Sequence, residues 1–269
     1  MLPELPEYVA LSHRWGKIMP LTLRKNDVET FKSGMPLSKL PKRFQDAVEI
    51  ARWMDIDYIW IDSLCIIQDS DADWSSESSK MGDIYANSYC NIAAPGDDSQ
   101  KGCFADRPIE MLEPSSVSEP GFGDVEKTHI LGYSDFWSNS LLDMPLHRRV
   151  WVVQEQVLSP RTVHFGQDQI FWECRETKAC EAYPHGIPEA FCNWRTRDWG
   201  KLDEEVISSR THPEDARVQP QPQLLQRLYA FLTSPLRLLC KSTATPQTPM
   251  TYGLWGKTFG RYRKFKLTC

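Results

Sequence analysis

The alternation of short apolar runs with segments of helical periodicity constrains the fold more than any other feature of this sequence. Three short runs, at residues 8–12, 58–61 and 88–94, indicate strands, and the second of them is β-branched and aromatic throughout. Between them, apolar residues recur at helical spacing after Pro41 and again after Asp73. This order of elements predicts an α/β unit, in which helices cover both faces of a parallel sheet.

The two predicted helices begin with recognisable signals. Proline suits a helix start because its missing N–H costs nothing there, so Pro41 marks the first helix. Asp73 is the expected N-cap of the second. The side chains expected on the buried side of this second helix are Trp74, Met81, Ile84 and Tyr85.

Later parts of the chain give weaker signals. Residues 161–166 and 169–174 predict two strands of an antiparallel hairpin. Residues 95–130 are rich in turn-forming and acidic residues, and no element is predicted there. Past residue 180, only residues 224–239 have a helical pattern. The expected organisation is therefore a domain at residues 1–180 and an irregular C-terminal extension, truncated or partly disordered, at residues 181–269.

Composition excludes several classes of protein. The chain has 269 residues, of which 41% are hydrophobic and 25% charged, as is usual for a soluble globular protein. A net charge of -5 gives no reason to expect nucleic acid, which needs a basic patch. No apolar run approaches the roughly 20 residues that span a membrane. The basic stretch at residues 241–269 is either a solvated end or a contact for an anionic partner.

The cysteines bear on the compartment. The chain has eight of them, with no Cys-x-x-Cys pair and no zinc-like spacing. Most adjoin apolar residues, so we expect buried, reduced thiols. Cys65 is either a reactive thiol or an inert core thiol. His147 and His164 have no ligand partners nearby in sequence, so we propose no metal. Reduced thiols and the lack of a signal peptide favour a cytoplasmic protein.

One later stretch combines an indole and a carboxylate. Residues 148–155 predict the first turns of a short helix that Pro145 introduces and that ends near Ser159. Trp151 and Glu155 are four residues apart and therefore share a helical face. A carboxylate held against apolar groups is desolvated, which raises its pKa and makes it a candidate acid, base or charge stabiliser. Alternatively, Glu155 caps the helix or pairs with a neighbouring arginine.

The ends of the predicted strands are the expected ligand site, because open parallel sheets bind ligands beyond the carboxyl ends of their strands. Arg14 is a candidate phosphate ligand, or else a surface charge. Asp62 and Ser63 either face a ligand or cap a turn. Gly16 lets the chain turn sharply or a ligand approach the backbone. The remaining residues at these ends are His13, Trp15 and residues 95–97.

Several segments resemble the fungal heterokaryon-incompatibility (HET) domain. Residues 8–16 are similar to its opening motif, usually Tyr-x-Ala-Leu-Ser-Tyr-x-Trp-Gly, with His13 in place of the second tyrosine. Residues 60–69, Trp-Ile-Asp-Ser-Leu-Cys-Ile-Ile-Gln-Asp, resemble its most distinctive block. Further blocks that look like those of the family lie, in the family's order, at residues 40–47, 74–94, 149–161 and 165–174.

This resemblance implies a role in fungal non-self recognition and regulated cell death. HET domains look distantly similar to TIR domains, which have a flavodoxin-like parallel sheet flanked by helices and in some branches cleave NAD. The Trp-x-x-x-Glu pattern of the TIR catalytic helix falls here on Trp151 and Glu155. The resemblance therefore makes Glu155 the candidate catalytic residue. The candidate ligand-binding residues are Arg14, Trp15, Gly16, Asp62, Ser63 and Trp151.

The implied chemistry is hydrolysis of the bond between ribose and nicotinamide. Such a cleavage develops oxocarbenium character, which a carboxylate near the ribose stabilises. Trp151 would stack on a flat ring or simply fill the core. NAD would be a substrate, and no cofactor is expected. Two other hypotheses are a non-enzymatic death-signalling module that acts by self-association, and an inactive, truncated family member. The expected partners are a second copy of the chain and a nucleotide.

Overall fold

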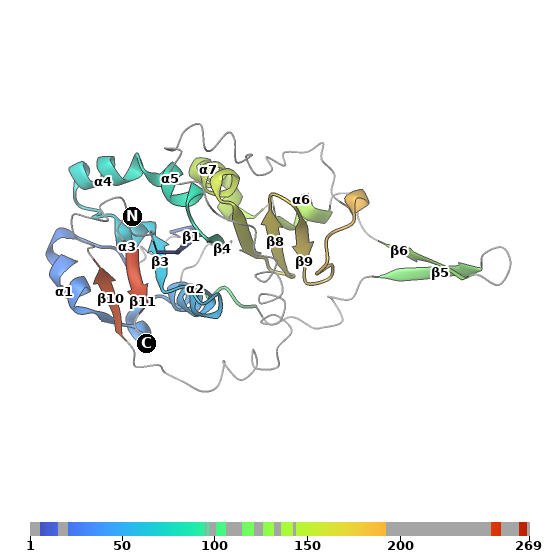
Figure 1. The fold of residues 1–269 in the computed structure, drawn as a ribbon, viewed down its shortest axis with the longest axis horizontal. Coiled ribbons are helices and arrows are strands. Elements are labelled where there is room, and N and C mark those ends of the chain that lie inside the picture. Colours follow the sequence, from blue (N-terminus) through green and yellow to red (C-terminus); the bar gives the residue numbers. More distant parts are fainter. Residues whose placement is uncertain are drawn as a thin grey trace, which may run out of the picture.

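The structure is a computed structural model that describes residues 6–15, 21–94, 96, 101–105, 115–120, 126–131, 136–141, 144–191, 249–253 and 264–267. Its main sheet has the strand order β2-β10-β11-β3-β1-β4-β7-β8-β9 (Figure 1). The parallel strands at its centre are β1 (Val9–His13), β3 (Tyr58–Ile61), β4 (Cys90–Ala94) and β7 (Arg161–Phe165). The α/β fold expected from the sequence is thus confirmed.

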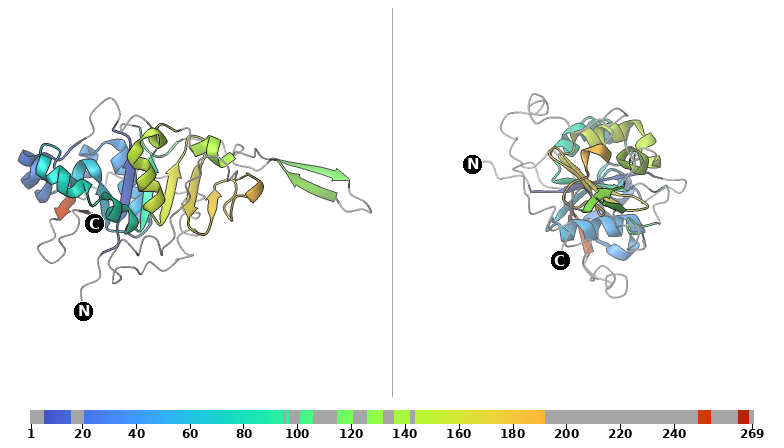
Figure 2. Two further views of the ribbon diagram at one scale, coloured as in Figure 1. Left: turned by 90° about the horizontal axis from the view of Figure 1, so that it is seen from above. Right: turned by 90° about the vertical axis from the view of Figure 1, so that its right-hand side faces the viewer.

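Helices cover both faces of this sheet. Helix α2 (Lys42–Trp53) joins β1 to β3 across one face. Helices α4 (Asp71–Ser78), α5 (Met81–Ala86) and α7 (Val150–Leu158) lie on the opposite face (Figures 1 and 2). The chain passes from β1 to β3 on one side of β1, and then to β4 and β7 on the other side. The strand order therefore reverses at β1. A crevice at the carboxyl ends of β1 and β4 follows from this topology.

The central strands form because both of their faces are buried. Val9, Ile59 and Ile61 are fully inaccessible, and β1, β3 and β4 contain no exposed residue. Continuous β-branched runs of this kind are typical of strands in a parallel sheet. On the face of α5, the buried indole of Trp60 packs edge-on against Tyr85, with ring centroids 5.5 Å apart.

Antiparallel strands extend both ends of the sheet. The predicted hairpin is confirmed: β8 (Ile170–Cys174) pairs with β7 and is followed by β9 (Lys178–Cys180). At the other end, β11 (Lys264–Leu267) pairs with β3, and β10 (Pro249–Gly253) lies between β11 and β2 (Met35–Pro36). The sequence predicted no strand at the C-terminal end, because short alternating runs lack a clear signal on their own.

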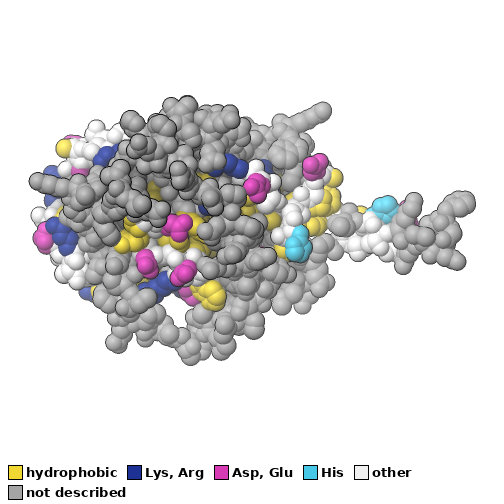
Figure 3. Space-filling model, viewed as in Figure 1, with side chains coloured by type: hydrophobic (Ala, Val, Ile, Leu, Met, Phe, Trp, Pro, Cys, Tyr) yellow, Lys and Arg dark blue, Asp and Glu magenta, His cyan; other side chains and the backbone are white. Residues whose placement is uncertain are grey.

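A second hairpin stands apart from the main sheet. Strands β5 (Ser116–Pro120) and β6 (Glu126–Ile130) pair only with each other and project from the body of the molecule (Figures 1 and 2). No element was predicted there, since the strands bury little surface that would give an apolar pattern. The space-filling view shows the same projection, with acidic and basic side chains interspersed on the described surface (Figure 3).

The remaining described elements are short. They are α1 (Val28–Ser33), α3 (Asp62–Cys65), α6 (Phe136–Leu141) and the 3-10 turns η1 (Lys25–Asp27), η2 (Leu37–Lys39), η4 (Pro145–Arg148) and η5 (Glu189–Phe191). None of the described helices is long and apolar enough to cross a membrane. The helix predicted at residues 224–239 lies outside the described residues.

The helix predicted after Asp73 is in fact two helices, α4 and α5, separated at Ser79 and Lys80. Asp73 is not the N-cap, because α4 already begins at Asp71; its carboxylate instead accepts the Ile67 N–H at 2.8 Å. The prediction that Trp74 is buried was also wrong, since half of its surface is exposed. Apart from Trp74, α4 is almost entirely polar, so it has no apolar stripe to turn toward the core.

The helix predicted from Pro145 is likewise divided. Pro145 begins the 3-10 turn η4, Arg149 is extended (φ −88°, ψ 136°), and α7 begins only at Val150. Its end at Leu158 confirms the prediction, and the Ser159 hydroxyl donates a hydrogen bond to the Glu155 carbonyl at 2.6 Å. The extended residue is important because it directs the arginine side chain toward the end of β1.

We expect Trp60→Ala to lower the free energy of unfolding by about 3–5 kcal/mol, the usual cost of truncating a fully buried tryptophan. Trp53→Ala is the matched control, because Trp53 on α2 is 37% exposed and its truncation should cost about 1 kcal/mol or less. Urea denaturation of the two variants measures the difference. Equal losses would mean that Trp60 is not part of the packed core.

Candidate active site

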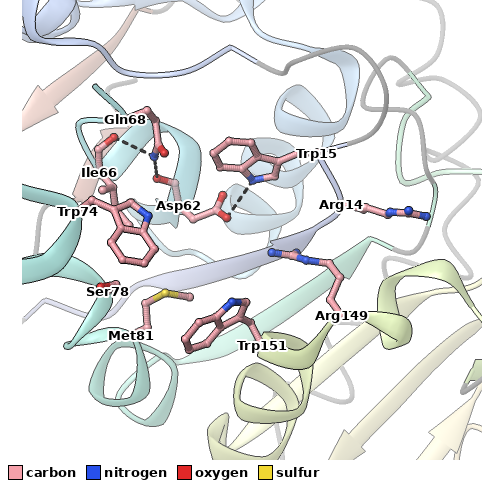
Figure 4. A pocket seen from close by; sticks show the side chains of 10 residues that line it. All are labelled: Arg14, Trp15, Asp62, Ile66, Gln68, Trp74, Ser78, Met81, Arg149 and Trp151. Atoms are coloured by element: carbon pink, nitrogen blue, oxygen red, sulfur yellow. Dashed lines mark hydrogen bonds between the residues drawn. The ribbon is translucent and has the colours of Figure 1, made fainter. Parts of the chain in front are cut away.

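A cleft of about 340 Å³ opens at the carboxyl ends of β1 and β3, the edge that the sequence predicted for a ligand. It is bounded by residues of α4, α5 and the start of α7. Its lining consists of Arg14, Trp15, Asp62, Ile66, Gln68, Trp74, Ser78, Met81, Arg149 and Trp151 (Figure 4). Of the predicted site residues, the structure therefore brings together Arg14, Trp15, Asp62 and Trp151.

Two of the other three predicted residues do not line the cleft. Ser63 is fully buried below it, and Glu155 is 2% exposed on α7. Gly16 lies outside the described residues. The cleft also contains six residues that were not predicted to contribute, which are Ile66, Gln68, Trp74, Ser78, Met81 and Arg149.

Three indoles surround the space inside the cleft. In Figure 4, Trp15 and Trp151 lie on opposite sides of it and Trp74 on a third side, with Met81 between Trp74 and Trp151. The exposed fractions of Trp74 and Trp151 are 50% and 51%. Aromatic side chains of this size usually contribute to cores or interfaces, so the cleft presents apolar surface on which a flat ring can lie.

Asp62 fixes the position of Trp15. Its Oδ2 accepts a hydrogen bond from the Trp15 Nε1–H at 3.0 Å, and its Oδ1 accepts the Ser63 N–H at 2.6 Å. His13 Nδ1 lies 3.7 Å from the same Oδ1, but burial lowers the pKa of this imidazole, so the contact joins a neutral ring to a carboxylate. Asp62 thus borders the cleft, and as the first residue of α3 it also accepts the N–H of the residue that follows it.

Arg149 provides a cation inside the cleft. Its guanidinium reaches into the space from the α7 side, whereas the side chain of Arg14 extends away from the centre (Figure 4). Arg149 also donates a hydrogen bond to the His13 carbonyl, which joins the start of α7 to the end of β1. Sequence reasoning treated this arginine only as an ion-pair partner. Its place between a 3-10 turn and a helix, which sets its direction, was not apparent from the residues.

Glu155 lies one helical turn beyond Trp151 and is buried under α7. Burial raises the pKa of its carboxyl to about 7, and the nearby Asp62 carboxylate adds to this rise. The Arg149 cation and a hydrogen bond with Ser12 offset part of the effect. Within the described residues, Glu155 Oε2 has no hydrogen-bond partner and the carboxylate forms no salt bridge. The carboxyl is therefore close to half protonated at neutral pH.

Other buried polar groups adjoin Glu155 beneath α7. The Ser12 hydroxyl on β1 donates a hydrogen bond to Asn91 Oδ1 on β4 at 3.0 Å. Tyr85 on α5 is buried, and burial together with the Glu155 carboxylate raises the pKa of its hydroxyl. The helix that bears Glu155 thus covers a polar strip of the sheet.

This polar strip continues toward β8. Gln156 Nε2 donates a hydrogen bond to the buried Glu173 Oε2 at 3.3 Å, and His164 Nε2 lies 3.5 Å from the same oxygen. Burial and the adjacent His164 lower the pKa of His147 to about 4. Among the described residues, no group of three or more histidines, cysteines or acidic side chains is arranged to hold a metal ion.

Cys65 has the surroundings of a core thiol. Its side chain is fully buried and its sulfur accepts a hydrogen bond from the Ile61 N–H at 3.4 Å. The five described cysteines are all free thiols, and only Cys174 is partly accessible. The cleft therefore has no thiol in its lining, and its ionisable side chains are carboxylate and guanidinium groups.

The parallel sheet, with its cleft at the strand ends, defines an α/β domain with a ligand-sized site. The family model described as heterokaryon incompatibility protein (HET) matches residues 8–155, more than half of the chain. The chain therefore belongs to the heterokaryon incompatibility family, as its motifs indicated, and heterokaryon incompatibility is the function that this membership supports. Comparisons with curated proteins and with solved structures give no match.

The raised pKa of Glu155 makes a prediction about stability. Between about pH 4.5 and 7 the folded state holds this proton more tightly than the unfolded state, so stability falls as the pH rises through that window. Across this window the free energy of unfolding falls by an amount on the order of 3 kcal/mol, and the fall is complete above about pH 8. We expect Glu155→Gln to abolish it, as measured by urea denaturation from pH 4 to 9.

The control for this measurement is Glu176→Gln, which removes a carboxylate from an exposed position. It should leave the pH dependence of unfolding close to that of the wild type. If Glu155→Gln and Glu176→Gln change the pH dependence equally, Glu155 is not the buried, desolvated carboxyl described above.

Proposed function

We propose that this heterokaryon incompatibility domain promotes regulated cell death by hydrolysing NAD in the indole-lined cleft. One observation carries the proposal: a buried carboxyl with a pKa near 7 lies one helical turn behind the Trp151 wall of a cleft that contains an inward-directed arginine. Carboxyls displaced toward neutral pH in or beside clefts are candidates for catalysis. The free thiols are consistent with action in a reducing compartment, the cytoplasm.

The residues of the cleft suit a dinucleotide. Trp15 and Trp151 offer surfaces for flat rings, and Arg149 suits a diphosphate because a guanidinium binds phosphate oxygens in pairs. Arg14, at the rim, adds a second positive charge on the same side. The first turn of α7 has no acidic residue, so its N–H groups add positive potential there.

Asp62 and Ser63 would act on the sugar side of the ligand. The Asp62 carboxylate has exposed surface in the cleft and can accept a hydrogen bond from a ribose hydroxyl. Ser63 is buried, so its contribution is indirect, through the N–H that orients Asp62. Gly16, beside Trp15 in sequence, is proposed to let the ligand approach the backbone.

In the proposed reaction, the bond between C1′ of the ribose and the pyridinium nitrogen breaks, and its electron pair neutralises the departing nicotinamide. The Glu155 carboxylate stabilises the positive charge that develops on the ribose. Water then adds to C1′, and its proton passes to the carboxylate and on to solvent. The products are ADP-ribose, nicotinamide and a proton, so no cofactor is consumed.

This mechanism requires Glu155 to meet the ribose, although Glu155 is buried and does not line the cleft. We propose that the Trp151 side chain reorients when the ligand binds, so that its indole stacks on the base and the ribose reaches Glu155. Half of the indole surface is already exposed, and Trp151 lies in the first turn of α7, directly after the extended Arg149. The Arg149 cation already lies close enough to Glu155 to favour its ionised form.

A non-enzymatic module that acts by self-association is the second candidate function. The projecting β5–β6 hairpin favours it, because isolated two-stranded hairpins are marginally stable in water and gain stability from a partner. Val117 and Leu131 on this hairpin are each about half exposed. A second copy of the chain is the proposed partner. In this case Glu155 would be a structural residue without a catalytic role.

The direct test is to incubate purified protein with NAD and to follow nicotinamide release. We expect Glu155→Ala and Glu155→Gln to reduce kcat by about a hundredfold or more, the usual loss when a charge-stabilising group is removed. Size-exclusion chromatography and circular dichroism establish that each variant is folded and assembled. Release that survives both substitutions removes Glu155 from the mechanism, and absence of release by folded, assembled wild type favours the self-association module.

The pH dependence gives an independent test. Because the carboxylate form of Glu155 is the active one, kcat/KM should rise tenfold per pH unit below about pH 7 and level off above it. Initial rates of nicotinamide release between pH 5 and 9 measure this profile. A rate that falls with increasing pH in this range would show that the protonated carboxyl, rather than the carboxylate, is required.

A further inference from the structure

We infer that Trp74 and Trp151 form a ring clamp that binds the planar heteroaromatic base of a nucleotide. This inference rests on the proposed function and deepens it, because it names the part of the ligand that the cleft selects. Trp74 comes from α4 and Trp151 from α7, so the clamp joins two helices that follow different strands of the sheet. Both indoles line the same cleft (Figure 4).

The exposure of the two indoles is the first argument for the ring clamp. Each has about half of its surface accessible. In the part of the chain that the structure describes, neither indole makes a hydrogen bond or a ring contact, although the Trp15 indole does. Leaving two large aromatic surfaces in water is unfavourable by about 25 cal/mol per Å². A ligand that covers both surfaces recovers this free energy.

The surroundings of the ring clamp indicate what that ligand is. Met81 and Ile66 add apolar surface to the cleft beside the indoles, which suits a ring rather than a hydrated sugar. Across the cleft, Trp15 is held in place by Asp62 and closes its far side. The Arg149 guanidinium enters between these walls. A flat base next to a phosphate matches this combination, as in a nucleotide.

The chemical class follows from these contacts. Among the described lining residues, a sugar phosphate without a base would bind to the two arginines and Asp62, while a base without phosphate would bind to the indoles and the apolar side chains beside them. The ring clamp should therefore discriminate mainly by the base, since each stacked base contributes about a factor of 5 to 150 in affinity. Among the described lining residues, Gln68 and Ser78 are the uncharged side chains with hydrogen-bonding amide or hydroxyl groups, so they offer few contacts that would distinguish one base from another.

The test uses the Glu155→Gln protein, which binds without consuming the ligand, and calorimetric titration with NAD, AMP, nicotinamide mononucleotide and ribose 5-phosphate. We expect the three ligands with a base to bind at least tenfold more tightly than ribose 5-phosphate. Adding Trp74→Ala should weaken NAD binding by roughly 5- to 150-fold, and Trp74→Phe should restore most of the loss. Trp53→Ala, a change of a partly exposed tryptophan outside the cleft, should have no effect.

Three results would overturn the ring clamp: unchanged affinity in Trp74→Ala, equal affinity for AMP and ribose 5-phosphate, or no nucleotide binding by folded protein. The last would indicate that the indoles receive a protein side chain instead. The proposed function fails separately. If nucleotides bind with the expected dependence on Trp74 but wild-type protein releases no nicotinamide, the ring clamp stands and the hydrolysis is excluded.

Discussion

The hydrogen bond from the Arg149 guanidinium to the His13 carbonyl sets the geometry on which the site depends. It joins the residue that precedes α7 to the last residue of β1, where the strand order reverses. One side chain thereby fixes the height of the helix above the strand ends and places a positive charge at the mouth of the cleft. It also brings Glu155 close enough for the guanidinium to lower its pKa.

The fold could be predicted well from the sequence where burial is complete. The strands β3 and β4 lie within the core, so their runs of buried residues gave a clear signal. The hairpin of β7 and β8 was predictable for the same reason. The prediction did not identify β5, β6, β10 and β11, because β5 and β6 bury little apolar surface and the short runs of β10 and β11 lack a clear signal on their own.

The site was only partly predictable. The order of the strands alone predicted a ligand site at the carboxyl edge of the sheet. Arg14, Trp15 and Asp62 do lie together in the cleft at that edge. Trp74 was misplaced because an isolated indole on a polar helix was assumed to face the core. Arg149 was overlooked because its direction depends on one extended residue between two helical segments. The depth of Glu155 below the cleft surface likewise depends on tertiary packing, which the Trp-x-x-x-Glu spacing does not specify.

The polar strip beneath α7 has a consequence for the dynamics of the domain. This helix meets the sheet through Glu155 and Gln156 as well as through Val152, so part of its attachment consists of hydrogen bonds that water can replace. The free energy needed to open a segment with few apolar contacts is lower than the free energy of unfolding the whole domain. Because α7 carries both Trp151 and Glu155, detachment of the helix would take both side chains away from the cleft, and the integrity of the site depends on how readily this one segment lifts.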